Sequence, residues 1–196
     1  MAISKEEQRI ITLEQEIARL REQLTTDELT KILNRKGLME LLKPWAREVG
    51  FQLSHPDRRK ALVVRALSLV FVDVDHFKKV NDTFGHQAGD LALKSIAKVL
   101  KENVREIDIV GRYGGEEIVL GLIGANLQDS RKIAEHLRVK IAERPIKYKD
   151  EIIKITASFG VSALSADLNL DALIKKADEA LYRAKNSGRN KVVTAN

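Results

Sequence analysis

The chain of 196 residues is 44% hydrophobic and 32% charged, which is typical of one globular domain with a short appendage. It has no cysteine, which excludes disulfides and thiolate metal sites. It also has no secretory signal and no apolar run near the roughly 18 residues that a membrane span needs. We therefore expect a cytoplasmic protein without a membrane segment. The net charge of +6 is spread along the chain without a dense Lys/Arg block, which argues against a nucleic-acid partner and suits an enzyme for polyanionic nucleotides.

Residues 1–25 carry a narrow apolar stripe with charged and amide side chains elsewhere. The stripe has spacings of three and four residues and consists of Ile10, Leu13, Ile17, Leu20 and Leu24. This seam predicts a signalling helix that forms a two-stranded coiled coil, and therefore a homodimer, ahead of a second domain at 26–196. The alternative is an amphipathic helix that lies on its own domain.

The segment 25–35 interrupts the seam, and Asn34 is the expected N-cap of a helix that runs towards Val49. Pro44 either kinks this helix or starts a second piece. The segment 50–60 is rich in polar residues and predicts a loop.

The residues 67–74 are almost all apolar and many are β-branched, which predicts a central strand buried on both faces. Asp73 and Asp75 lie two residues apart at its end, so we expect both on one face of the sheet. Buried carboxylates are costly unless a cation or hydrogen-bond donors satisfy them, although a capping or turn role would explain either Asp alone. The following loop, 76–90, has the composition of an anion-binding loop and precedes a helix at 91–103.

A β-hairpin is predicted by two apolar runs, 107–113 and 116–123, on either side of Gly114-Gly115. The tip lacks side chains and adjoins Glu116 and Glu117, so a phosphate chain could approach beside two carboxylates that suit a hard cation. A solvated structural hairpin is the alternative, because short motifs of this kind also occur by chance.

The remaining pattern predicts helices at 127–144 and 170–186 and strands at 151–161 and 191–193. The order β-α-β-β-α-β indicates an α+β, ferredoxin-like, palm-type sheet that contains antiparallel strands, is flanked by helices and is preceded by the coiled-coil helix. In this topology the first strand lies beside the hairpin arm that starts at Glu116, which brings Asp73 close to Glu116.

Five blocks in order over residues 27–195 resemble the GGDEF domains, the diguanylate cyclases of bacterial signalling. The blocks are DELTKILNR at 27–35, FVDVDHFKKVNDTFGHQAGD at 71–90, RYGGEEI at 112–118, ASFGV at 157–161 and ADEALYRAKNSGRNKV at 177–192. Two departures are Ile118, where the family usually has Phe, and Lys31, where it often has Gly.

The resemblance implies condensation of two GTP into cyclic di-GMP with release of two pyrophosphates, by a two-metal mechanism at a homodimer interface. It implies that Asp73 and Glu116, with the carbonyl of Val74, hold two Mg²⁺ or Mn²⁺ ions per active site, and that Glu117 contributes to metal binding or catalysis. It also implies that the guanine base is recognised by Asn81 and Asp90, because a carboxylate accepts from guanine N–H groups that adenine lacks.

The triphosphate is expected to meet basic side chains, backbone amides and the bare hairpin tip. By resemblance these residues are Lys78, Lys185 and Arg189, the amides of His76 and Phe77, and Gly114 and Gly115. The side chains of His76 and His86 lack the spacing of metal ligands, so we interpret both as ordinary loop residues.

Arg105 and Asp108 form an RxxD sequence at the position of the family's product-binding inhibitory site, so cyclic di-GMP is expected to act as an inhibitor as well as a product. The alternative is a surface ion pair. A second inhibitory arginine among Arg58, Arg59 and Arg65 cannot be assigned from the sequence. The competing function is a catalytically silent cyclic di-GMP receptor, which would not need a complete set of metal and guanine residues.

Overall fold

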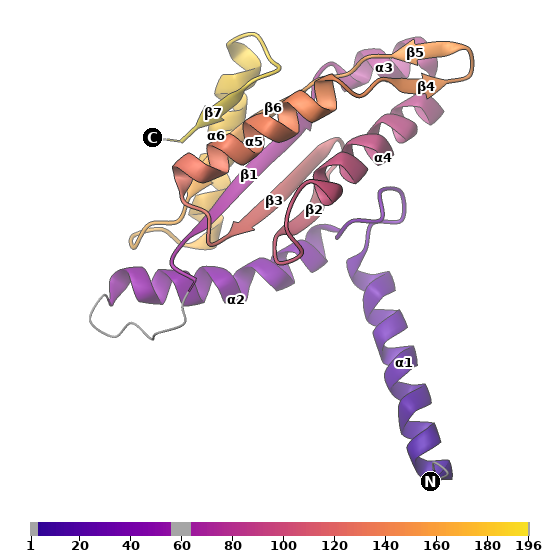
Figure 1. Cartoon of the computed structure of the whole chain (residues 1–196), viewed down its shortest axis with the longest axis vertical. Helices are drawn as coiled ribbons and strands as arrows, with labels where there is room; N and C mark the ends of the chain where they lie inside the picture. The colour runs from indigo at the N-terminus through magenta and orange to yellow at the C-terminus, as the bar shows by residue number, and fades with distance from the viewer. Residues whose placement is uncertain (1–3, 56–63, 196) are drawn as a thin grey trace.

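The computed structural model describes residues 4–55 and 64–195 (Figure 1). The helices are α1 (Lys5–Thr25), α2 (Arg35–Ser54), α3 (Phe77–Phe84), α4 (His86–Glu102), α5 (Leu127–Ala142) and α6 (Leu170–Asn186). The strands are β1 (Leu67–Val74), β2 (Ile109–Gly114), β3 (Glu117–Ile123), β4 (Ile146–Tyr148), β5 (Glu151–Ile153), β6 (Ala157–Ala163) and β7 (Val192–Thr194).

The main sheet has the strand order β2-β3-β1-β6-β7, with β1 at its centre. β1 pairs antiparallel with both β3 and β6, while β7 pairs parallel with β6. Helices cover both faces of this sheet (Figure 1), which explains why all eight residues of β1 are buried. The predicted α+β class with a largely antiparallel sheet flanked by helices is therefore confirmed.

The alternation along β1 decides which side chains meet which helices. Val70, Val72 and Val74 pack in the core cluster that contains residues of α4 and α5, whereas Leu69 and Phe71 pack with residues of α2 and α6. Asp73 continues the second series, because side chains two residues apart on a strand share a face. The last turns of α6 consequently lie close to the carboxylate of Asp73.

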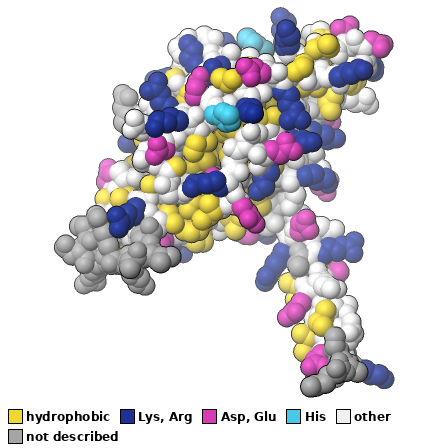
Figure 2. Space-filling view, in the orientation of Figure 1, with side chains coloured by type: hydrophobic (Ala, Val, Ile, Leu, Met, Phe, Trp, Pro, Cys, Tyr) yellow, Lys and Arg dark blue, Asp and Glu magenta, His cyan; other side chains and the backbone are white. Residues whose placement is uncertain are grey.

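α1 projects from the domain as a separate arm (Figure 1). It begins with a capping box in which Ser4 and Glu7 bond each other's backbone N–H groups. The five apolar residues of the predicted seam are 48–59% exposed, and hydrophobic side chains line this arm in Figure 2. The predicted helix is confirmed, and its pairing with a second copy stays a prediction. Within residues 4–55 and 64–195, no helix is both long enough and apolar enough to cross a membrane.

Two predictions on either side of β1 were wrong. α2 passes through Pro44 and continues to Ser54, so most of the expected loop that lies in the described residues is helical; the rest of that loop, 56–63, lies outside them. The expected anion-binding loop is also mostly helix, because α3 occupies 77–84 and α4 starts at His86 instead of 91. Gly85, with φ of 84°, separates the two helices.

The region between α5 and α6 differs from the prediction as well. The expected strand 151–161 is two strands, because β5 turns back on the unpredicted β4 to form a two-stranded sheet, while β6 joins the main sheet. Lys149 takes a left-handed φ of 54° in the turn between β4 and β5. The helix expected at 127–144 ends at Ala142, and the last strand starts one residue later than expected, at Val192.

Candidate active site

Three acidic residues lie near one another where β1 ends beside the hairpin. The β1–β3 register places Asp73 opposite Glu117, while Glu116 lies in the turn. The prediction expected Glu116 to be the nearer neighbour in the sheet, but an irregularity in the β2–β3 register between Arg112 and Gly114 moves the turn to Gly115-Glu116, and Gly115 takes a φ of 44°. The expected acidic cluster forms, with Glu117 as the direct partner across the strands.

Lys185 contributes the positive charge of this cluster. It comes from the last turn of α6, and its Nζ lies 2.8 Å from a carboxylate oxygen of Asp73. Burial raises the pKa of Asp73 above its ordinary value, the contact with Lys185 opposes that shift, and the charges of Glu116 and Asp75 add to it. Burial also raises the pKa of Glu117, and the neighbouring charge of Asp73 raises it further. The site therefore holds more negative charge than Lys185 offsets.

The acids fit a divalent cation that shares its ligands with a substrate. Within the described ranges, no three His, Asp or Glu side chains converge tightly enough to form a complete protein cage. Mg²⁺ is usually held by one or two carboxylates together with substrate phosphates, so an incomplete set is the expected arrangement for a nucleotide enzyme. Lys185, as a cation against the buried Asp73, shows that the carboxylate takes a positive partner.

α3 starts shortly after Asp73 and Asp75 in the sequence. His76 adopts a left-handed conformation with φ of 57° and places the helix start at Phe77, two residues after Asp75. The first N–H groups of a helix have no partner within it and favour anions. The amide of Phe77 and the side chain of Lys78 belong to this first turn, which supports the predicted phosphate site.

The predicted guanine residues lie on the two helices that follow β1, Asn81 on α3 and Asp90 on α4. The side-chain oxygen of Asn81 is buried without a hydrogen-bond partner among the described residues. A Cβ atom at Gly89 would lie 1.9 Å from that oxygen, so a residue larger than glycine would displace the amide of Asn81. Asp90 follows on α4 and is exposed. A ligand that brings an N–H group to the oxygen of Asn81 would satisfy it.

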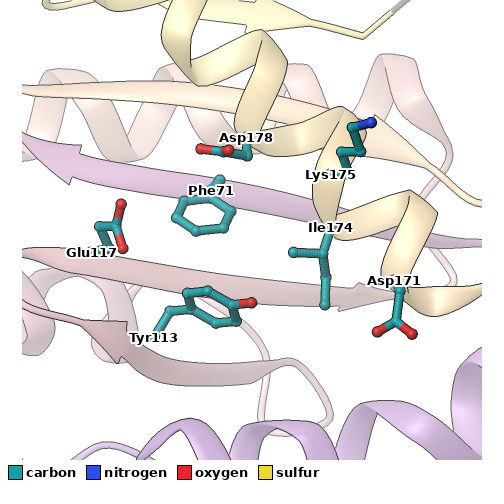
Figure 3. A pocket seen from close by; sticks show the side chains of 7 residues that line it. All are labelled: Phe71, Tyr113, Glu117, Asp171, Ile174, Lys175 and Asp178. Atoms are coloured by element: carbon teal, nitrogen blue, oxygen red, sulfur yellow. The ribbon is translucent and has the colours of Figure 1, made fainter.

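A cavity of about 320 Å³ opens beside Glu117, between the hairpin and α6 (Figure 3). Phe71, Tyr113 and Glu117 from three neighbouring strands form one side, and the other side consists of Asp171, Ile174, Lys175 and Asp178 of α6. Tyr113 and Asp178 were not predicted as site residues. The helical spacing of Asp171, Ile174, Lys175 and Asp178 indicates that they share one face of α6, and this pattern could have pointed to Asp178.

One ion pair and two hydrogen bonds that were not predicted hold the hairpin against the segment after α1 and the start of α2. Arg112 Nη1 lies 3.1 and 3.2 Å from the two carboxylate oxygens of Asp27, and its Nε donates to the carbonyl of Gly115 at 2.8 Å. Arg35 adds a second contact, since its guanidinium donates to the hydroxyl of Tyr113 at 3.0 Å. The tip of the hairpin is thereby tied to the base of the stalk.

Arg105 and Asp108, the predicted inhibitory pair, contact each other. Two guanidinium nitrogens of Arg105 donate to the carboxylate of Asp108 at 2.9 and 3.1 Å. Asp108 is only 3% exposed and also accepts from the backbone N–H groups of Arg105 and Ile123. Arg105 remains on the surface. Of the arginines considered for a second inhibitory contact, Arg58 and Arg59 lie outside the described residues, and Arg65 is exposed just before β1.

The comparison with protein families decides the identity. The family described as "Diguanylate cyclase, GGDEF domain" matches residues 24–191. The chain belongs to the GGDEF family. Among curated relatives, it is 40% identical over 175 residues to diguanylate cyclase DgcP of Pseudomonas aeruginosa, which covers 89% of this chain and 24% of the relative. It is 40% identical over 171 residues to the response regulator PleD of Caulobacter vibrioides, and the match covers 86% of this chain and 35% of PleD.

Solved structures of GGDEF domains agree with this fold. The coiled coil and GGDEF domain of DgcB from Caulobacter crescentus, crystallised with c-di-GMP, superposes with a TM-score of 0.84 at 27% identity and covers 95% of this chain and 94% of that one. Diguanylate cyclase SiaD of Pseudomonas aeruginosa, solved with its activator SiaC, gives a TM-score of 0.77 at 34% identity. The match covers 95% of this chain and 70% of the SiaD chain. The chain spans less than half the length of the curated relatives DgcP and PleD.

The two departures of this GGDEF domain from its family lie in different surroundings. Ile118 is buried in β3 against the core, where an apolar side chain of another shape is tolerated. Lys31 has φ of 59°, a left-handed conformation that glycine adopts without strain. The glycine often found at this position of GGDEF domains thus matches the backbone geometry.

The charge excess of this GGDEF site predicts a stabilising variant. A raised pKa means that the folded state disfavours ionised Glu117, so its contribution to stability is full below the ordinary value of 4.5 and is lost as the pH rises through the raised pKa. We expect Glu117→Gln to raise the melting temperature of the metal-free protein at pH 7 and to leave it unchanged below about pH 4. Thermal unfolding in EDTA across this range measures the effect.

Glu151→Gln provides the matched control, because Glu151 is exposed on β5 away from the acidic cluster. The electrostatic interpretation is wrong if Glu117→Gln melts at or below the wild-type temperature at pH 7. It is also wrong if both variants shift the melting temperature equally.

Proposed function

We propose that this chain is an active diguanylate cyclase that condenses two GTP into cyclic di-GMP and releases two pyrophosphates. The observation that carries the proposal is the placement of Asp73 opposite Glu117, with Glu116 and Lys185 adjoining, in a chain that belongs to the GGDEF family. The receptor alternative is less well supported, because a protein that only binds the product has no need of this acidic cluster or of the guanine residues Asn81 and Asp90.

In this proposal each domain binds one GTP through its own residues. Asn81 and Asp90 orient the guanine, and the first turn of α3 with Lys78, Lys185 and Arg189 receives the triphosphate. Gly114, at the end of β2, and Gly115, in the turn, have no side chains, so the phosphates can lie against the backbone there. Discrimination against ATP follows from Asp90, since a carboxylate cannot accept from the adenine edge as it does from guanine N–H groups.

Asp73, Glu116, Glu117 and the carbonyl of Val74 would hold two Mg²⁺ or Mn²⁺ ions. When bound, these ions lower the pKa of the attacking 3′-hydroxyl and offset charge on the phosphoryl oxygens. Lys185 would then move from Asp73 to the phosphate oxygens, because the cations take over its role against the carboxylate. Each 3′-hydroxyl attacks the α-phosphorus of the nucleotide on the other domain, and pyrophosphate leaves.

Two domains must face each other for this reaction, and α1 is proposed to bring them together. Its exposed seam offers an apolar surface that a second α1 would cover as a coiled coil. Linking the domains raises their effective concentration, so the stalk would set how often the competent dimer forms. We retain the division into a stalk at 1–25 and a cyclase domain at 26–196.

The experiment that tests the function is incubation of the purified chain with GTP and Mg²⁺, followed by mass spectrometry of the nucleotides. We expect cyclic di-GMP and pyrophosphate, no product after EDTA, and a specific activity that rises with protein concentration until the dimer is saturated. Tightly copurified cyclic di-GMP with no turnover at any concentration would reject the cyclase and favour the receptor.

Product feedback through Arg105 is a further part of the proposal. The exposed guanidinium can stack on guanine and pair with phosphate, while the buried Asp108 carboxylate keeps Arg105 in place. We expect Arg105→Ala to weaken inhibition by added cyclic di-GMP at least tenfold. It should also lower the free energy of unfolding by about 1–3 kcal/mol, because the buried Asp108 loses its charged partner.

Inhibition curves and thermal unfolding of the same preparations measure both effects. Lys101→Ala is the control, since Lys101 is an exposed cation that lines the same surface pocket as Asp108. An Arg105→Ala enzyme with the wild-type inhibition curve would show that the product does not bind there.

A further inference from the structure

Asp75 is buried beside the proposed active site, yet the proposed mechanism gives it no role. It is only 5% exposed, and its carboxylate accepts three hydrogen bonds. Ser158 Oγ donates at 2.6 Å, Thr156 Oγ1 at 2.7 Å and the backbone N–H of Asn190 at 3.0 Å. The first two donors come from β6 and the residue before it, and the third comes from the turn between α6 and β7.

That turn has an unusual backbone. Gly188, Arg189 and Asn190 follow one another with φ values of 110°, 61° and 44°. A left-handed conformation is strained for a residue such as arginine, while glycine and asparagine tolerate it better. The N–H of Arg189 donates to the carbonyl of Ala184 in α6, and the remaining support comes from side chains outside the turn.

Two side chains from other elements bond to this turn. The carboxylate of Asp75 takes the backbone N–H of Asn190, and Arg138 of α5 donates to the side-chain oxygen of Asn190 at 2.7 Å. Arg138 is itself fixed by Glu135, whose carboxylate lies 2.6 Å from the nearest guanidinium nitrogen. Both of these contacts fall on Asn190, the residue next to Arg189.

Asp75 also adjoins the start of α3 in the chain, since His76 and Phe77 follow it directly. The hydrogen bond between Asp75 and Asn190 therefore joins two parts of the proposed phosphate site. Asp75 directly precedes the proposed phosphate-binding amides, and Asn190 directly follows Arg189. The two halves of the triphosphate site come from segments more than a hundred residues apart, and Asp75 is where they meet.

We propose that Asp75 is a positioning residue, which holds the left-handed turn at 188–190 so that Arg189 faces the triphosphate together with the first turn of α3. The inference rests on the proposed function, because it assigns Asp75 to the phosphate subsite of that site. Asp75 acts by the geometry of its hydrogen bonds, and its negative charge is not required for the role.

This distinction makes the test sharp. Asp75→Ala removes the acceptor, whereas Asp75→Asn keeps one oxygen for the N–H of Asn190 and presents an NH₂ group to a hydroxyl that can rotate to accept it. We expect Asp75→Ala to raise KM for GTP about tenfold, with a smaller change in kcat, and Asp75→Asn to restore most of the wild-type KM. A residue that acted as a metal ligand would not be rescued by Asn.

A double-mutant cycle identifies the group through which Asp75 acts. If Asp75 works through Arg189, Asp75→Ala combined with Arg189→Ala should weaken GTP binding no more than Arg189→Ala alone. Competition by guanosine, which lacks phosphates, should be the same in Asp75→Ala as in the wild type. Additive losses in the cycle, or equal weakening of guanosine and GTP, would overturn the proposal.

Two further measurements extend the test. Hydrogen exchange of the Asn190 amide, which does not depend on turnover, should accelerate in Asp75→Ala and be slow again in Asp75→Asn. If Asp75→Ala does not fold, Arg138→Ala removes the other side-chain contact to the same turn and should also raise KM for GTP. An unchanged KM in Arg138→Ala would reject the proposal that these contacts position Arg189. A wild-type chain that neither binds nor turns over GTP would instead reject the proposed function.

Discussion

Asp73→Asn is expected to reduce the formation of cyclic di-GMP by on the order of 10³-fold, because charge stabilisation by bound metal contributes several kcal/mol to such reactions. Asp73 is buried at the end of the central strand and takes a positive partner already in Lys185. Asparagine has the same shape and cannot supply the negative charge. Initial rates at saturating GTP with Mg²⁺, and again with Mn²⁺, measure the loss.

Glu116→Gln is the companion variant, since Glu116 lies in the turn and its replacement leaves the pair of Asp73 and Lys185 in place. A similar loss is expected, with thermal unfolding close to that of the wild type. If Asp73→Asn kept more than a tenth of the wild-type turnover, Asp73 would not be a metal-binding residue. If only Glu116→Gln did so, the metal role would belong to Asp73 and Glu117.

Gly160→Ala is expected to be the most destabilising small substitution in the described part of the domain. A Cβ atom there would lie 2.1 Å from the carbonyl oxygen of Ala177 and 2.2 Å from the backbone nitrogen of Leu181. Both are backbone atoms of α6, so no side chain can rotate away and the helix must move off β6. Overpacking usually costs about 1–3 kcal/mol, and this site should lie at the upper end.

For a domain of this size, a loss of about 3 kcal/mol lowers the melting temperature by roughly 6–12 °C. Turnover should fall as well, because α6 carries Lys185 into the site. Gly50→Ala is the control, as a Cβ atom at Gly50 meets nothing within 4 Å and alanine favours the helical backbone of α2. Equal melting temperatures for Gly160→Ala and the wild type would show that α6 and β6 can separate freely.

Most of the sheet and its acidic edge could be predicted from the sequence, because local patterns encode them. The apolar run of β1 places Asp73 at a strand end, and the Gly-Gly pair predicts the hairpin. The pairing of Asp73 with Glu117 could not be predicted, since it depends on the register between β1 and β3, which no local pattern determines. The guanine residues Asn81 and Asp90 followed from the resemblance alone, and the close approach of Asn81 to Gly89 appears only once α3 and α4 pack.

The features that the sequence did not predict depend on contacts between distant segments or on short elements with weak periodicity. α3 has only eight residues, and its many polar side chains are equally typical of a loop. β4 and β5 have three residues each, too few for a clear alternation. The bonds from Arg112 to Asp27 and from Asn190 to Asp75 join residues 85 and 115 positions apart, and no local pattern reports them.

The bonded junction between α1 and the domain has a consequence for any unit joined upstream. Asn34 donates to the carbonyls of Leu24 and Thr26, Asp27 pairs with Arg112, and Arg112 donates to the carbonyl of Gly115, so a continuous chain of hydrogen bonds joins the last turn of α1 to the hairpin tip. Each residue inserted into a helix rotates the downstream part of the chain by about 100°. Stalk length therefore sets the angular phase of the active sites, and seven-residue steps nearly restore it, whereas other insertions would turn the two sites out of alignment.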